Sequence, residues 1–234
     1  MRFAGEVAVV TGASRGIGRA TAERLAEEGA LVVAAARDGE ALAALASSAA
    51  RGRVRPVACD VARTEDVARL FATAADLGGC SILVAAAGVL TRASVEETTD
   101  EVWTETLAVN LSGAFRCARA AFAQMRSRGG GRIVLISSLS GVYGTEKFPG
   151  LLAYNASKHG VVGLVEGLAV EGREHGISAL GLSPGAVDTE MLRAANPDLR
   201  PGLQPEDVAE LIAELLDGPI RAASGANVPL FSNR

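Results

Sequence analysis

The sequence predicts an α/β protein with a single doubly wound parallel sheet of about seven strands and helices on both faces. Short apolar runs of β character alternate with longer segments of helical period over almost all of the 234 residues. The runs are apolar throughout, as is typical of strands that are covered on both faces. Strand, helix and strand repeated in this way indicate right-handed crossovers within one sheet.

The expected strands are rich in Val, Ile, Leu and Ala, and lie at Glu6–Val10, Leu31–Ala35, Val54–Ala58, Ser81–Ala85, Arg132–Ser137, Ile177–Ser183 and Asn227–Leu230. The expected helices lie at Gly16–Glu28, Gly39–Ala49, Thr64–Leu77, Asp100–Arg128, Tyr154–His175 and Pro205–Leu216. Thr64 and Thr99, each close to acidic residues, supply capping groups at two helix starts. No linker, repeat or low-complexity segment divides the chain, so residues 1–234 are expected to form one domain.

The composition excludes several classes of protein. A hydrophobic content of 49% and a charged content of 21% are ordinary for a soluble globular domain. The net charge of −4 argues against a nucleic-acid partner. No run approaches the ~18 apolar residues of a membrane span, and Glu6 interrupts any signal peptide, so a cytoplasmic location is expected. Cys59, Cys80 and Cys117 lack metal-ligand spacing and are predicted to be buried, reduced thiols, with no metal site.

A glycine-rich loop, TGASRGIG at residues 11–18, follows the first strand and runs directly into a helix. Gly12, Gly16 and Gly18 would let the backbone approach a diphosphate at the positive end of that helix. Ser14, Arg15 and Ile17 complete the loop. This placement indicates a dinucleotide site and a sheet of the Rossmann type, although a tight strand-to-helix turn needs glycine in any case.

The end of the second strand bears on which dinucleotide is bound. An acidic residue often stands there to bond the ribose 2′-hydroxyl, but this chain has Ala36 followed by Arg37. An arginine can bond a 2′-phosphate bidentately, and Arg15 would approach the same phosphate from the glycine loop. Asp38 is expected to point into the next helix start. The pattern favours NADPH/NADP+ over NAD(H), unless both arginines are simply solvated.

The stretch YNASK, residues 154–158, pairs a tyrosine with a lysine in a chain whose 23 basic residues include only one other lysine, Lys147. Tyr154 and Lys158 would share one helix face, one turn apart. An ammonium beside a phenol lowers the pKa of the phenol, which suits acid–base chemistry on an alcohol–carbonyl pair. The alternative is a chance tyrosine and lysine at a helix start.

A series of motifs runs through the chain: TGASRGIG, CDV at 59–61, AAAG at 85–88, Asn110, ISS at 136–138, YNASK, and PG at 184–185. Their types and order resemble those of the short-chain dehydrogenase/reductase family, and especially its 3-oxoacyl-thioester reductases, over essentially the whole length. The resemblance implies a cofactor half at about residues 1–130 and a catalytic half at about residues 131–234.

The same resemblance implies four catalytic roles. Tyr154 would donate a proton to the nascent alkoxide in reduction, or remove the alcohol proton in oxidation. Lys158 would bond the nicotinamide ribose and lower the pKa of the tyrosine. Ser138 would hydrogen-bond the substrate oxygen, and Asn110 would hold a water in a proton relay towards Lys158.

Further cofactor contacts follow from the resemblance. Asp60 and the backbone of Val61 would contact the adenine, and Ala87 and Gly88 would line the cofactor channel. The stretch Pro184–Thr189 would close over the nicotinamide; its contact residues are Pro184, Gly185, Val187 and Thr189.

The chain departs from the family pattern at three places. Ala85 and Ala86 replace two asparagines, with the loss of a brace at a strand end. Ser138 and Tyr154 are 16 residues apart, further than in many members, which leaves Ser137 and Ser140 as substitutes for the serine. The chain also ends differently, with SGANVPLFSNR after the last helix.

The substrate pocket is expected between Leu90–Arg92, Leu139–Leu152 and Glu190–Arg200, beyond the carboxyl ends of the strands. Its candidate residues are Leu90, Leu139, Tyr143, Phe148, Met191 and Leu192. They suggest a hydrophobic or mixed carbonyl substrate, although Met191 and Leu192 would serve equally as an anchor for the lid. Arg92 and Arg193 would either bind an anionic tail of the substrate, such as an acyl-carrier phosphopantetheine, or be solvated surface residues. His159 and His175 are read as structural.

The sequence therefore predicts an NADPH-dependent reductase of a small-molecule carbonyl, possibly of 3-oxoacyl type. The alternatives are an NAD-dependent alcohol or sugar dehydrogenase, and an NADPH-binding regulatory or scaffold protein without turnover. The helices Asp100–Arg128 and Tyr154–His175, with Gly160, Gly163 and Gly167 on the second, favour a homodimer or homotetramer. The same glycines would also serve close packing on the chain's own sheet.

Overall fold

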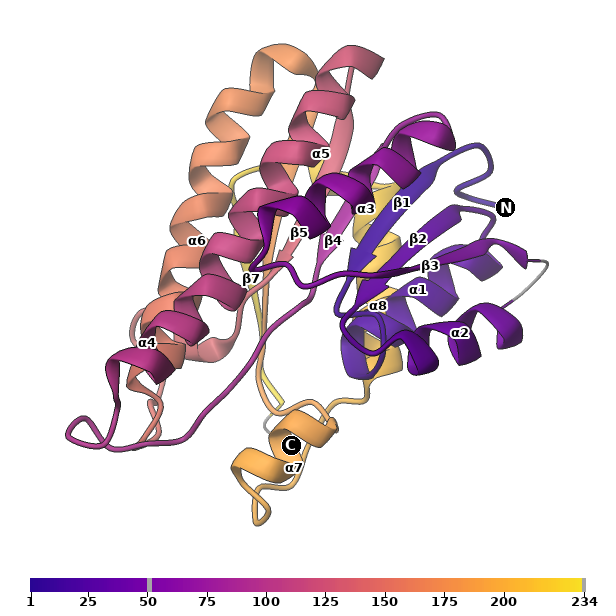
Figure 1. Ribbon diagram of the computed structural model, residues 1–234. Helices are drawn as coiled ribbons and strands as arrows, with labels where there is room; N and C mark the ends of the chain where they lie inside the picture. The colour runs from indigo at the N-terminus through magenta and orange to yellow at the C-terminus, as the bar shows by residue number, and fades with distance from the viewer. Residues whose placement is uncertain (50–51, 233–234) are drawn as a thin grey trace.

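A computed structural model describes residues 1–49 and 52–232. Its centre is a parallel sheet of seven strands in the order β3-β2-β1-β4-β5-β6-β7 (Figure 1). The strands are β1 Val7–Thr11, β2 Leu31–Ala36, β3 Val54–Ala58, β4 Ile82–Ala85, β5 Gly131–Ile136, β6 Ile177–Pro184 and β7 Asn227–Leu230. The chain builds outwards from β1 in one direction and from β4 in the other, which confirms the doubly wound fold.

Helices cover both faces of the sheet. They are α1 Gly16–Glu27, α2 Gly39–Ser48, α3 Thr64–Asp76, α4 Asp100–Leu107, α5 Ala114–Arg128, α6 Leu152–Gly172, α7 Glu190–Ala195 and α8 Pro205–Asp217. In Figure 1, α3, α5 and α6 lie on one face and α1, α2 and α8 on the other. None of the helices in the described part of the chain is long and apolar enough to cross a membrane.

Three details differ from the prediction. The expected helix at 100–128 contains a π-helical turn, Ala108–Gly113, between α4 and α5. The short helix α7 was not predicted, although the Thr189 hydroxyl caps it by accepting from Leu192 N. Thr99 caps α4 as expected, but the expected cap at Thr64 is wrong because Arg63 is the N-cap and Thr64 is the first residue of α3.

Successive residues of the strands point to opposite faces of the sheet and pack into two hydrophobic cores, one on each face. On β1, Ala8 and Val10 pack with residues of α1 and α8, whereas Val7 and Val9 pack with residues of α3 and α5. The three cysteines are buried free thiols, as predicted. Burial raises the pKa of the Cys80 thiol to about 12, so this cysteine is a core residue and a poor nucleophile.

Close backbone approaches place the loops at the carboxyl edge of the sheet. A Cβ on Gly12 would lie 2.8 Å from the Ala87 backbone, and a Cβ on Gly18 would lie 2.3 Å from Gly12 O. The Thr11 hydroxyl also accepts from Ala87 N at 3.2 Å. This bond braces the strand end at which the family pattern would place asparagines.

Candidate active site

A cavity of 1540 Å³ runs along the carboxyl edge of the sheet, between the glycine loop and α7. All of the residues predicted to contact the cofactor or the substrate line it. These residues come from the loops and helix starts that follow β1, β2, β3, β4, β5 and β6, so they are far apart in sequence and meet only in the fold. Asn110 is the one predicted site residue that is not among the lining residues.

The glycine loop forms a cradle at the start of α1. Gly16 has a φ of +55°, which favours glycine, and a Cβ there would lie 3.1 Å from Thr189 Cγ2. No acidic residue stands in the first turn of α1, so the positive end of the helix, which lines the cavity, carries no carboxylate of its own. The cradle therefore fits the diphosphate of a dinucleotide.

Two arginines lie beside this cradle. Arg37 follows β2 and is exposed at the cavity wall. The neighbouring Asp38 caps α2 by accepting from Ala41 N at 3.0 Å, as predicted. Arg15 Nη1 lies 2.8 Å from Glu190 Oε2, so this arginine already has an anionic partner on α7. The cavity wall thus carries two arginines after β1 and β2, and the Asp38 carboxylate beside Arg37 is engaged at the start of α2.

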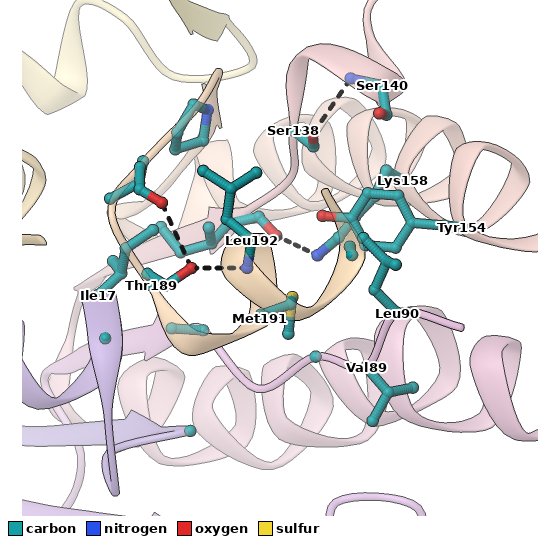
Figure 2. A pocket seen from close by; sticks show the side chains of 18 of the residues that line it. Ile17, Val89, Leu90, Ser138, Ser140, Tyr154, Lys158, Thr189, Met191 and Leu192 are labelled. Atoms are coloured by element: carbon teal, nitrogen blue, oxygen red, sulfur yellow. Dashed lines mark hydrogen bonds between the residues drawn. The ribbon is translucent and has the colours of Figure 1, made fainter. Parts of the chain in front are cut away.

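Tyr154 and Lys158 lie in the first two turns of α6, which begins at Leu152 instead of at Tyr154. Lys158 is 5% exposed, and its Nζ donates to Ile136 O at 3.0 Å. The same ammonium lies 5.5 Å from the centroid of the Tyr154 ring. Figure 2 shows the two side chains next to each other, with Ser138 nearby.

The prediction of a lowered tyrosine pKa is wrong for this structure. Burial raises the pKa of Tyr154, and the nearby Ser138 hydroxyl offsets only part of that effect. Burial also lowers the pKa of Lys158 to about 8. Both shifts have the same cause, because a low dielectric disfavours the phenolate and the ammonium alike.

The two serines after β5 have different environments. The Ser137 hydroxyl is 4% exposed and donates to Lys158 O at 2.8 Å. The Ser138 hydroxyl lines the cavity and accepts from Ser140 N at 3.1 Å. A hydroxyl that accepts at its oxygen still has one hydrogen to donate. Of the two hydroxyls, the one of Ser138 therefore keeps a hydrogen that it can donate into the cavity.

Asn110 lies behind the cavity wall in the π-helical turn and is 1% exposed. Its Oδ1 accepts from Val89 N at 2.8 Å, and its Nδ2 donates to Val89 O and to Ser157 Oγ. The side chain thus ties α6 and the loop after β4 together. A Cβ on Gly88 would lie 3.4 Å from Asn110 Oδ1 and 3.7 Å from Lys158 Nζ, so this loop also contacts the lysine.

The substrate end of the cavity is largely apolar. Leu90, Leu139, Met191 and Leu192 all line it, together with Phe148 and the 96% exposed Tyr143. The sequence reasoning missed Phe231 and Ser232, which also line the cavity. No local pattern marks them, because it is the pairing of β7 with β6 that sets Leu230 beside Pro184 and brings the next residues to the lid, residues 184–195.

The two arginines considered for anion binding have other partners. Arg92 lines the cavity, but it donates to Pro149 O at 3.3 Å and to Ala195 O at 3.0 Å. Arg193 pairs with Asp188 on the lid. Both arginines therefore connect parts of the chain. Nowhere in residues 1–49 and 52–232 do three or more His, Cys, Asp or Glu side chains gather closely enough to hold a metal ion.

Comparison with known proteins gives consistent results. The family model for short chain dehydrogenases matches residues 6–200. An uncharacterized oxidoreductase of Staphylococcus aureus (strain USA300) is 35% identical over 215 residues, which is 92% of each chain. A 3beta-hydroxysteroid dehydrogenase of Mediterraneibacter gnavus is 37% identical over 203 residues, or 85% of this chain and 72% of that protein.

Solved structures agree in fold. A short-chain type dehydrogenase/reductase from Mycobacterium marinum superposes with a TM-score of 0.91 at 30% identity, over 98% of this chain and 95% of the other. A dehydrogenase/reductase from Sinorhizobium meliloti 1021 gives 0.88 at 35% identity, over 99% and 96%.

Proposed function

Since the chain belongs to the short-chain dehydrogenase family and is an NAD(P)-dependent oxidoreductase, we propose that it reduces a ketone to an alcohol with NADPH. The observation that carries this proposal is the grouping of Ser138, Tyr154 and Lys158 on the wall of one cavity with the glycine cradle. Within one cytoplasmic domain, about residues 1–130 carry most of the cofactor contacts, and about residues 131–234 carry the catalytic tyrosine, serine and lysine and most of the substrate contacts.

A bound nicotinamide supplies the hydride, and the chain's own residues hold the reactants and move the proton. Ser138 donates a hydrogen bond to the carbonyl oxygen, and Tyr154 gives its phenolic proton to the same atom. Lys158 holds the nicotinamide ribose. A raised tyrosine pKa keeps the phenol protonated near neutral pH, which suits the acid of a reduction better than the base of an oxidation.

The residue positions support further assignments. The cradle Gly12–Gly18 takes the diphosphate, Arg37 and Arg15 take the 2′-phosphate, and Asp60 with Val61 contacts the adenine. Asn110 acts by holding Val89 and Ser157 in place through hydrogen bonds of its side chain. A water of the proposed proton relay towards Lys158 would lie next to these groups. An NAD-dependent alcohol or sugar dehydrogenase is less well supported because Arg37 stands next to the position of the expected acid.

Two substrate classes are supported. The apolar lining suits a hydrophobic ketone such as a 3-oxoacyl thioester. A cyclic secondary alcohol or ketone of the steroid type is the second candidate, because one relative is named a 3beta-hydroxysteroid dehydrogenase. The rim residues Tyr143, Phe148 and Phe231 would contact the bulky end of either substrate.

The direct test is consumption of NADPH and NADH by the purified protein over a panel of acetoacetyl thioesters, diketones and cyclic ketones. We expect turnover of at least one class, with NADPH preferred, and none by the Tyr154→Phe variant. That variant should still bind NADPH, because the phenol oxygen acts on the substrate. NADPH binding without turnover on any ketone would instead favour the regulatory alternative, and substantial turnover by Tyr154→Phe would exclude the proton-donor role.

We also propose a homodimer or homotetramer formed through α4, α5 and α6. Trp103, Phe115 and Val170 expose large side chains on these helices, and Gly163 and Gly167 leave open space beside α6. Gly160 instead packs on Leu111 of the same chain. Light scattering should give two or four times the mass of one chain, and a monomer at micromolar concentration would rule out this assembly.

A further inference from the structure

The chain's second lysine, Lys147, makes an unusual set of contacts. Its Nζ lies 3.0 Å from Leu139 O, 2.6 Å from Val142 O and 2.6 Å from Thr145 Oγ1. One ammonium therefore bonds three oxygens of the loop that directly follows Ser138. Lys147 is not among the residues that line the cavity, so its position indicates a contact with the loop and not with the substrate.

The geometry explains why lysine stands here in a chain that otherwise uses arginine. An ammonium carries three hydrogens around one nitrogen, which matches three oxygens that converge on a point. A planar guanidinium spreads its donors over a fork and cannot satisfy the same set. Thr145 completes the arrangement, because its hydroxyl accepts from Lys147 and donates back to Leu139 O at 2.5 Å. Lys147 is exposed to solvent, and the partial desolvation of its ammonium lowers its pKa.

The loop that Lys147 closes is in contact with the catalytic group. Its 3-10 turn, Leu139–Gly141, begins where Ser140 N donates to the Ser138 hydroxyl. Gly141 is buried, and a Cβ there would lie 2.5 Å from Lys158 O and 2.6 Å from Ser137 Oγ. A shift of this turn would therefore move the serine hydroxyl relative to α6.

The outer side of the same loop forms part of the substrate wall. Leu139, Val142 and Tyr143 all line the cavity, and two of the three oxygens bonded by Lys147 belong to the backbone of Leu139 and Val142. The cofactor cradle lies elsewhere, on the loop after β1. The loop's position should thus affect the carbonyl substrate much more than the dinucleotide.

We propose that Lys147 is a positioning residue that holds the loop 139–145 in place and thereby sets both the Ser138 hydroxyl and the substrate wall. The role in catalysis rests on the proposed reductase function. The role in holding the loop does not, and can be measured without any substrate.

The experiment compares Lys147→Met, which keeps the stem and removes the donors, with Lys147→Arg, which keeps the charge. Arg55→Met is the matched control, because it removes one exposed cation on β3, away from the cavity. For each protein we would measure hydrogen exchange of the peptides covering 139–147, the Kd for NADPH, and kcat and KM for the best ketone of the panel.

In Lys147→Met we expect faster exchange confined to 139–147 and kcat/KM lower by about tenfold or more, because small displacements of reacting groups are costly. The Kd for NADPH should stay within about twofold, since the cradle is untouched. Lys147→Arg should recover only part of the loss, and Arg55→Met should match the wild type in all three measurements.

Three results would overturn the proposal: unchanged exchange in 139–147, complete recovery by Lys147→Arg, or a loss of NADPH binding as large as the loss of kcat/KM. If the wild-type chain reduces no ketone, the proposed function fails by itself, and the exchange measurement still decides whether Lys147 holds the loop.

Discussion

The Arg15 guanidinium lies 2.8 Å from the Glu190 carboxylate and so joins the glycine loop to the first residue of α7 across the mouth of the cavity. The side chains are 60% and 62% exposed, so the pair contributes only about 0–1 kcal/mol. A 2′-phosphate carries more charge and accepts bidentately. In the proposed NADP+ complex, the 2′-phosphate would therefore compete with Glu190 for Arg15.

Removal of the competing carboxylate should strengthen NADP+ binding. In Glu190→Gln, Arg15 no longer has an anionic partner on α7, and we expect a Kd for NADP+ about threefold lower, equivalent to about 0.7 kcal/mol. The Kd for NAD+ should not change, because NAD+ has no 2′-phosphate. Titration calorimetry of both cofactors checks this, with Glu206→Gln on α8 as the control. An equal gain in affinity for NAD+ would show that the substitution acts through the position of the lid and not through the 2′-phosphate.

Cofactor selectivity should depend mainly on Arg37. Replacement by Ala removes a charge-assisted bond to the 2′-phosphate and should weaken NADP+ binding by about tenfold to a hundredfold, or about 1.5–3 kcal/mol. Binding of NAD+ should change little. The ratio of the two Kd values measures the effect directly, and Arg55→Ala provides a control of equal charge. A ratio that stays at its wild-type value would assign the 2′-phosphate to other groups.

The buried Lys158 should make stability depend on pH. Its pKa is lowered from 10.5 to about 8 by burial, so between these values the unfolded chain binds more protons than the folded one. The free energy of unfolding should therefore rise with pH across this window, by on the order of 2 kcal/mol relative to Lys158→Met. Urea denaturation of the wild type and of Lys158→Met near each end of this pH window measures the difference between their free energies of unfolding. The contributions of the other titrating groups are the same in both proteins and cancel in this difference. A difference that is flat with pH would mean that the lysine is charged throughout.

Gly113 ends the π-helical turn before α5 and packs against the loop after β3, so we expect that a side chain at this position does not fit. A Cβ there would lie 2.7 Å from Val61 Cγ2, against the wall of the cavity. Gly113→Ala should lower the free energy of unfolding by about 1–3 kcal/mol. Gly39→Ala, at a site with nothing within 4 Å, should be neutral or slightly stabilising. Thermal unfolding of both variants tests the contrast, and equal midpoints would show that α5 moves to make room.

Local patterns predicted most of the architecture. The apolar runs placed seven strands and their order in the chain, and the glycine loop, Arg37 and the YNASK stretch all proved to line one cavity. Helix α7 was not predicted because its six residues are too few to show a helical period of apolar side chains. Phe231 and Ser232 were not predicted as site residues because only the pairing of β7 with β6 brings them to the lid.

The sequence by itself determined which chemical groups this protein has and in which elements they stand: Tyr154 and Lys158 one turn apart, Ser138 after a strand, and Arg37 next to the position of the expected acid. Only the tertiary structure decided their environment. It buries the lysine, raises the pKa of the tyrosine, moves Asn110 behind the wall and assigns Arg15 and Lys147 their partners. The reason is physical, because spacing along a chain fixes which side chains share a helix face, whereas desolvation and hydrogen bonding depend on segments that meet only when the sheet assembles.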